Sequence, residues 1–160
     1  MTTPDITGAL STVLDELIAG AGPAAAWVLN PHDPGLLNSL QKLSAEEASA
    51  IPTTGGASIA AHVDHLRYGL QLLNRWSQGD DPDADYSASW DRIKVSEAEW
   101  VARREALRRE ADAWREAIKI PRDLTDFELT AVVASVAHLA YHLGAIRQMN
   151  RAIRGPSARD

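Results

Sequence analysis

Apolar residues recur every three to four positions through most of the chain, and this spacing predicts four long helices and no β-strand. The helices are expected near residues 5–20, 58–77, 96–118 and 126–153. Segments rich in Gly and Pro separate them, as is typical of interhelical loops. Because each helix carries an apolar face that must be buried, the pattern predicts an all-α four-helix bundle.

Helix starts are marked by a Ser or Thr that is followed three residues later by Glu. This spacing is typical of a capping box and occurs at Ser44, Ser96 and Thr125. Ser58 opens the second long helix, and a shorter helical segment, LLNSLQKL, begins at Leu36. The helix that follows Ser96 has a predicted buried stripe of apolar residues: Trp100, Leu107, Ala111, Trp114 and Ile118. On its other faces, Glu99 with Arg103 and Glu105 with Arg109 are expected to form exposed i,i+4 pairs.

The segment QGDDPDADYSASWDRIKV, residues 78–95, is predicted to be a long, solvated acidic loop. Its first aspartates resemble the start of an EF-hand loop, but Tyr86 replaces the required Gly and Arg92 replaces the bidentate acid. A loop of this length can cross the bundle, which predicts parallel second and third helices and an up-down-down-up topology. Residues 1–155 are expected to form one domain and residues 156–160 a frayed tail.

Composition excludes several classes of function. The 160-residue chain contains no Cys, so disulfides, thiolate metal sites and a cysteine nucleophile are excluded. A formal net charge of -6 argues against a nucleic-acid surface. No basic leader and no uninterrupted apolar run of membrane-spanning length are present, which predicts a cytoplasmic protein without membrane contact. Five Trp residues are many for this length, and one or two are expected in the core or at a homodimer face.

Four of the five histidines fall into two clusters, His62 with His65 and His138 with His142. Residues four apart on a helix project from one face, so two imidazoles can converge on one metal ion. A third imidazole from a facing helix would leave one coordination position open, as in catalytic sites. His32, in the turn NPHDPG, is expected to be solvated.

Two better-known metal patterns are excluded, and the residues beside the histidines favour an open site. A zincin helix would carry Glu directly after the first His, where this chain has Leu139. The inward-facing glutamates of a di-iron bundle are missing as well. Small residues dominate the predicted histidine faces, and Gly69 lowers helix stability by about 1 kcal/mol relative to Ala, which indicates that space is needed there. The alternative, hydrogen-bonded core histidines, applies better to a single His than to two clusters.

The segments SIAAHVDHL and HLAYHLGAIRQ, together with the upstream GLLNSLQKLSAEEA, resemble the DinB/YfiT-like superfamily of metalloenzymes. The resemblance implies a four-helix bundle with a divalent metal ion held by one histidine of the second helix and two of the fourth. His65, seven residues after Ser58, matches the first ligand, and His138 and His142 match the other two. His62, one turn earlier, is expected at the mouth of the site, behind a ligand, or as a fourth ligand.

The same resemblance implies a metal-dependent transferase or isomerase that uses a low-molecular-weight thiol. Because the chain has no Cys, the thiol would be a cosubstrate that reacts with a small electrophile. The alternatives are a metal-dependent hydrolase and a non-catalytic, metal-stabilised binding protein of the stress response. All-imidazole ligation suits zinc, nickel, iron or copper equally. Four arginines are candidates for binding an anionic substrate at the bundle mouth: Arg67, Arg75, Arg147 and Arg151.

Overall fold

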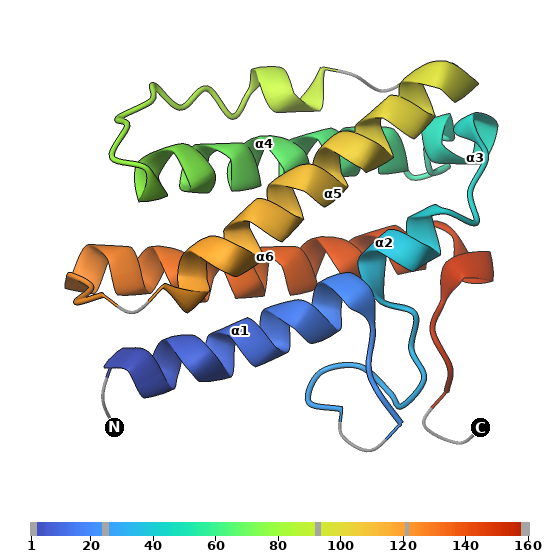
Figure 1. Cartoon of the computed structure of the whole chain (residues 1–160). Coiled ribbons are helices and arrows are strands. Elements are labelled where there is room, and N and C mark those ends of the chain that lie inside the picture. Colours follow the sequence, from blue (N-terminus) through green and yellow to red (C-terminus); the bar gives the residue numbers. More distant parts are fainter. Residues whose placement is uncertain (1–2, 24–25, 92–93, 121, 158–160) are drawn as a thin grey trace.

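The computed structural model describes residues 3–23, 26–91, 94–120 and 122–157, which form six α-helices, two 3₁₀ turns and no strand (Figure 1). The four long helices confirm the predicted all-α bundle. They are α1 (Thr3–Ala19), α4 (Ile59–Ser77), α5 (Glu97–Lys119) and α6 (Asp126–Met149). The short elements are α2 (Gly35–Leu40), α3 (Ala45–Ser49), and the 3₁₀ turns η1 (Ala88–Trp90) and η2 (Arg151–Ile153).

The long helices follow the predicted up-down-down-up order (Figure 1). Helices α1 and α6 run in one direction, while α4 and α5 run in the other, and the loop after α4 returns along the bundle to the start of α5. Both α1 and α4 pack against α5 and α6. Helices α4 and α6, which carry the two histidine clusters, are therefore antiparallel neighbours.

Helix boundaries follow the polar caps. Capping boxes are present at Ser44, Ser96 and Thr125, and the Ser58 hydroxyl accepts a hydrogen bond from the backbone N–H of Ala61. The last helix ends earlier than predicted, at Met149 rather than near residue 153. Asn150 leaves the helical conformation there, and its side chain caps the 3₁₀ turn that follows.

The core lies between the four long helices and confirms the buried stripe predicted for α5. Trp100 and Trp114 are buried and donate hydrogen bonds to the Leu43 carbonyl and the Ser135 hydroxyl, whereas Trp27 is 72% exposed. Contrary to expectation, α6 is long and apolar enough to span a membrane by length and composition. In the bundle this helix packs against α1 and α4, and helices of soluble proteins can meet the same criteria.

The prediction of exposed ion pairs on α5 is wrong for the exposure of Arg103 and for the partner of Glu105. Arg103 is buried and pairs with Asp64 of α4 at 2.8 Å, because the two helices pack closely there. Arg67 also binds Asp64, at 2.9 Å. Glu105 pairs with Arg108, three residues away, instead of with Arg109. The spacing along one helix could not reveal a partner on another helix.

The C-terminal segment remains attached to the bundle at least to Pro156, whose carbonyl accepts a hydrogen bond from the Asn30 side chain at 2.7 Å. Nearby, Arg147 forms two hydrogen bonds, of 2.9 and 2.6 Å, with the buried carboxylate of Asp33. A side chain at Gly155 would collide with that carboxylate, so glycine is required there. Residues 158–160 of the predicted tail lie outside the described residues.

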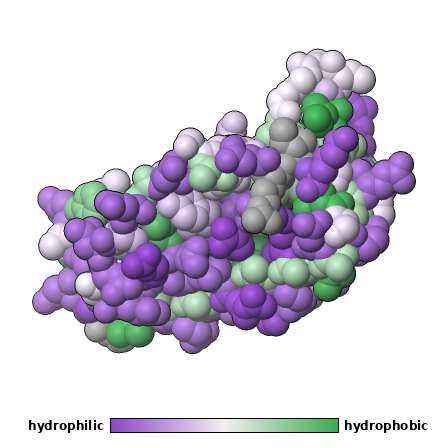
Figure 2. Space-filling view, turned by 90° about the horizontal axis from the view of Figure 1, so that it is seen from above, coloured by the Kyte–Doolittle hydropathy of each residue, from purple (hydrophilic) through white to green (hydrophobic). Residues whose placement is uncertain are grey.

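The surface seen from above, the side along which the loop after α4 runs, is mostly hydrophilic with small, separate apolar patches (Figure 2). The loop carboxylates Asp81, Asp83 and Asp85 are exposed, as predicted for a solvated acidic segment. Arg92 of the same segment lies outside the described residues.

Candidate metal centre

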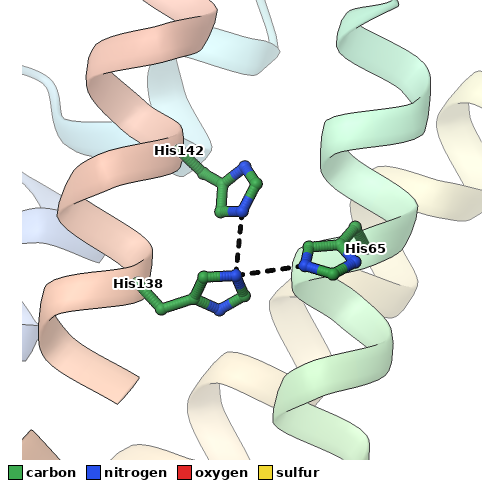
Figure 3. Close-up of side chains that lie close together, drawn as sticks. All are labelled: His65, His138 and His142. Carbon is green, nitrogen blue, oxygen red and sulfur yellow. Dashed lines mark hydrogen bonds between the residues drawn. The ribbon is translucent and has the colours of Figure 1, made fainter. Parts of the chain in front are cut away.

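Three imidazoles from α4 and α6 converge in the seam between these helices (Figure 3). The Nε2 atom of His138 lies 3.1 Å from Nε2 of His65 and 2.8 Å from Nε2 of His142. His65 and His142 are buried, with 8% and 2% of their surface exposed, and His138 is partly buried. The three residues predicted as ligands are therefore brought together, and they could hold one metal ion.

The donor set fits a divalent metal ion. Three nitrogens bound tetrahedrally at about 2.0–2.1 Å lie about 3.3 Å apart, close to the separations observed here. The candidate ligand atoms all lie within 4.8 Å of one another. The described residues place three imidazole nitrogens and no carboxylate in this set, which suits zinc, nickel, iron or copper better than magnesium or calcium, since the latter prefer oxygen ligands.

A buried serine fixes the tautomer of His65. The Ser89 hydroxyl donates its proton to the Tyr86 carbonyl at 2.6 Å, and it lies 2.8 Å from Nδ1 of His65. Because the hydroxyl has only one proton, it must accept the proton that His65 Nδ1 donates. Nε2 of His65 is then left with a lone pair directed at the triad, as metal ligation requires.

His62 lies behind His142 and outside the converging set of nitrogens. Its Nδ1 is 2.7 Å from Nδ1 of His142, the ring nitrogen that faces away from His138. This contact lets His62 accept a proton from His142 and leave Nε2 of His142 free as a ligand. The geometry therefore favours a position for His62 behind a ligand over a position at the mouth of the site or a role as a fourth ligand.

Burial keeps all four imidazoles in the neutral form. Burial and the neighbouring imidazoles of His138 and His62 lower the pKa of His65 to about 4. Burial and the neighbouring imidazoles lower the pKa of His142 to about 3. Burial also lowers the pKa of His62 and of His138. Neutral imidazoles at physiological pH are the form that binds metal ions.

The loop between α4 and α5 covers the triad, which the sequence pattern did not reveal. The Trp90 ring stacks on His65 with 4.2 Å between ring centroids and 24° between planes. The Tyr68 hydroxyl, on α4, accepts a hydrogen bond from the backbone N–H of Asp85 at 2.9 Å and anchors the loop. Tyr86 and Trp90, aromatic residues within an otherwise acidic segment, were the signal that this loop is docked and not merely solvated.

A cavity of about 370 Å³ adjoins His65 and His138 between α4 and α6. Its other walls are formed by apolar and aromatic side chains together with small residues: Leu66, Gly69, Leu70, Leu73, Trp76, Tyr86, Ala131, Ala134, Ser135 and Leu139. The space predicted beside Gly69 is therefore present. A Cβ at Gly69 would lie 3.8 Å from Cε1 of His138, an ordinary contact, so only a longer side chain would fill the cavity.

The arginines predicted at the bundle mouth are not in the site. Three of them pair with aspartates, in the pairs Arg67–Asp64, Arg75–Asp80 and Arg147–Asp33. None of the four, Arg151 included, lines the cavity beside the triad. Only Arg147 has its acidic partner in a distant segment, because Asp64 lies on the same helix as Arg67 and Asp80 follows Arg75 closely. His32 is exposed in its turn, as predicted.

Comparison with known proteins agrees with this geometry. No curated protein and no solved structure matches the chain significantly. The sequence model of the DinB superfamily matches residues 34–146, which include the long helices α4 and α5, both histidine clusters and the covering loop. This match spans well over half of the chain and confirms the predicted resemblance. The chain belongs to the DinB superfamily.

Proposed function

We propose that this protein is a metal-dependent transferase that joins a low-molecular-weight thiol to a small electrophile. The observation that carries the proposal is the convergence of three neutral imidazole Nε2 atoms beside an open cavity. His65, His138 and His142 would hold a divalent ion, with zinc, nickel, iron and copper as the candidates. Bound there, the ion would supply Lewis acidity that lowers the pKa of a thiol at the open coordination position.

Residues of this chain would prepare the site for that chemistry. Ser89 and His62 orient His65 and His142 through their Nδ1 atoms. Trp90 covers His65 and limits the access of water from the loop side. The adjoining cavity gives the electrophile a place next to the ion.

The thiol is preferred over water as the nucleophile. Among the described residues, neither the triad nor the lining of the cavity includes an Asp or Glu that could act as general base on water. A thiol depends less on a general base than water does, because its pKa is already near 8.5. With no Cys in the chain, the thiol must come from solution.

The test uses protein purified without a His-tag and loaded with each metal in turn. It is incubated with glutathione, mycothiol-like or bacillithiol-like thiols and a haloaromatic or maleyl electrophile. Turnover that disappears on chelation and in His142→Ala is the expected result. Full metal occupancy without turnover, and without a thiol-dependent shift in melting temperature, would instead favour a non-catalytic binding protein.

Location and assembly are part of the same proposal. We expect a cytoplasmic protein that contacts neither nucleic acid nor membrane. A homodimer would be formed through exposed apolar residues such as Trp27 or Tyr141, which are 72% and 68% exposed. Sedimentation analysis of the metal-loaded protein would establish the oligomeric state.

A further inference from the structure

We infer that the cavity between α4 and α6 binds the uncharged, apolar part of a small molecule and excludes anions. The inference extends the proposed function, on which it rests for the identification of this molecule as the electrophile. It follows from the size of the cavity, from its lining and from the position of His138 at its inner end.

The cavity has the size of a small aromatic compound. An apolar cavity of about 150 Å³ is sufficient for benzene. The volume here is about 370 Å³, which leaves room for a ring with several further atoms. Leu73, Trp76 and Ala131 also line a smaller pocket of about 50 Å³ beside this cavity, which in addition has Phe127 and the charged residues Arg122 and Glu128 in its lining.

The lining offers no charge to bind an anion. Among the described residues, the lining of this cavity includes no Lys, Arg, Asp or Glu. Its one aliphatic hydroxyl, on Ser135, donates to the Val132 carbonyl at 2.7 Å and accepts from Trp114 Nε1 at 2.9 Å, so both interactions are satisfied within the protein. Transferring an ion into such surroundings is strongly unfavourable unless it finds a partner.

His138 gives the cavity one polar end. Its Nε2 faces the other two imidazoles, and its second nitrogen points away from them (Figure 3). A Cβ added to Gly69, on the wall of the cavity, would lie 3.9 Å from that Nδ1 atom. Among the described residues no side chain or carbonyl is hydrogen-bonded to His138 Nδ1, which leaves it to a polar group of the ligand or to water. A neutral molecule with an apolar body and one polar end fits this arrangement.

The experiment compares acetophenone with benzoate, two probes of nearly the same shape that differ in charge. Binding to metal-free protein is followed by ¹H–¹⁵N NMR at the indole N–H of Trp76, with exposed Trp27 as the reference. Metal-free protein is used because a carboxylate can bind a metal ion directly. Acetophenone is expected to bind saturably, and benzoate at least tenfold more weakly.

Two variants fill the cavity from opposite walls. Gly69→Leu and Ala131→Leu are each expected to weaken acetophenone binding at least tenfold, whereas Gly69→Ala should change it less than twofold. Equal binding of benzoate, unchanged acetophenone binding in both leucine variants, or no saturable binding of acetophenone would overturn the inference. Metal content of the same variants is measured separately, so a wild-type protein that binds acetophenone but no metal would reject the proposed function alone.

Discussion

Two adjacent residues of α4 show how differently polar groups are used in this bundle. Asp64 faces α5, and its carboxylate lies 2.8 Å from Arg103 of that helix and 2.9 Å from Arg67 of α4 itself. His65 faces α6, where its neighbours are two further imidazoles, and the described residues place no acid among the ligand nitrogens. The first cluster contains its own counter-charges. The second gathers imidazole nitrogens around a shared point and could hold a cation, so it points to function, whereas the first points to stability.

The largest effect on stability should come from breaking the cluster of Asp64, Arg67 and Arg103. Asp64→Ala leaves Arg103 buried without its partner, and removing one member of such a pair destabilises a protein by about 3–5 kcal/mol. Urea unfolding would measure the change. Glu116→Ala, which removes an exposed pair with Lys119, is the matched control and should change stability by less than about 0.5 kcal/mol. Similar effects of the two substitutions would remove the distinction between the clusters.

Lowering the pH should destabilise the metal-free protein through the histidine cluster. The pKa of His65 is about 4 and that of His142 about 3, both below the ordinary value near 6.5 that the unfolded chain regains. Unfolding therefore takes up protons below pH 6.5. Stability is full above that pH and falls as the pH decreases from 6.5 toward about 3, by on the order of 2 kcal/mol at pH 5 for each of these two imidazoles.

Unfolding of metal-free protein at a series of pH values would measure this loss. In His142→Ala the slope between pH 6.5 and 5 should be clearly smaller, because one buried neutral imidazole is gone. An identical slope would mean that other groups cause the acid sensitivity.

Substitutions of Ser89 and His62, which contact the candidate ligands from behind, should have a smaller effect. Ser89→Ala removes the acceptor that holds His65 in the ligating tautomer, and His62→Ala removes the contact to His142. Each should weaken zinc binding by about 10-fold or somewhat more without abolishing it, as measured by competition with a chelator. Ser87→Ala, in the same loop but bonded to Asp85, is the control. Complete loss of zinc in His62→Ala would show instead that His62 is a fourth ligand.

The smallest expected change is a gain in stability. Gly69→Ala places a methyl group in ordinary contact with His138 and removes a helical glycine, so stability should rise by about 0.5–1 kcal/mol with metal binding retained. Thermal unfolding would detect the gain. A loss of stability would indicate that the helix requires glycine at this position.

The sequence predicted the helices and the His138–His142 pair because both depend on local spacing, whereas His65 was selected over His62 by the resemblance to the DinB family. Capping boxes located the helix starts, and the four-residue separation of His138 and His142 placed two imidazoles on one face. The remaining parts of the site depend on which segments meet in space. Ser89 and Trp90 lie in a loop without helical periodicity, and the aromatic residues of that loop could indicate that it docks but not that it docks on His65.

The predictions for two arginines were wrong for the same reason, because they too depend on which segments meet in space. Arg103 was expected to be exposed because its helical neighbours are charged, yet its partner Asp64 lies on another helix. Arg147 was considered for substrate binding, although its partner Asp33 is more than one hundred residues away in the chain. Ion pairs between distant segments are decided by the tertiary packing, which helical periodicity does not specify.

The most direct test of the central claim is the metal content of untagged protein and its single His→Ala variants, measured by elemental analysis. The wild-type protein and His32→Ala should each contain about one divalent ion per chain, while His65→Ala, His138→Ala and His142→Ala should contain little or none. Metal content in His138→Ala equal to that of the wild-type protein, or no binding by the wild-type protein after incubation with zinc, nickel, iron or copper, would contradict the assignment of the triad as a metal site.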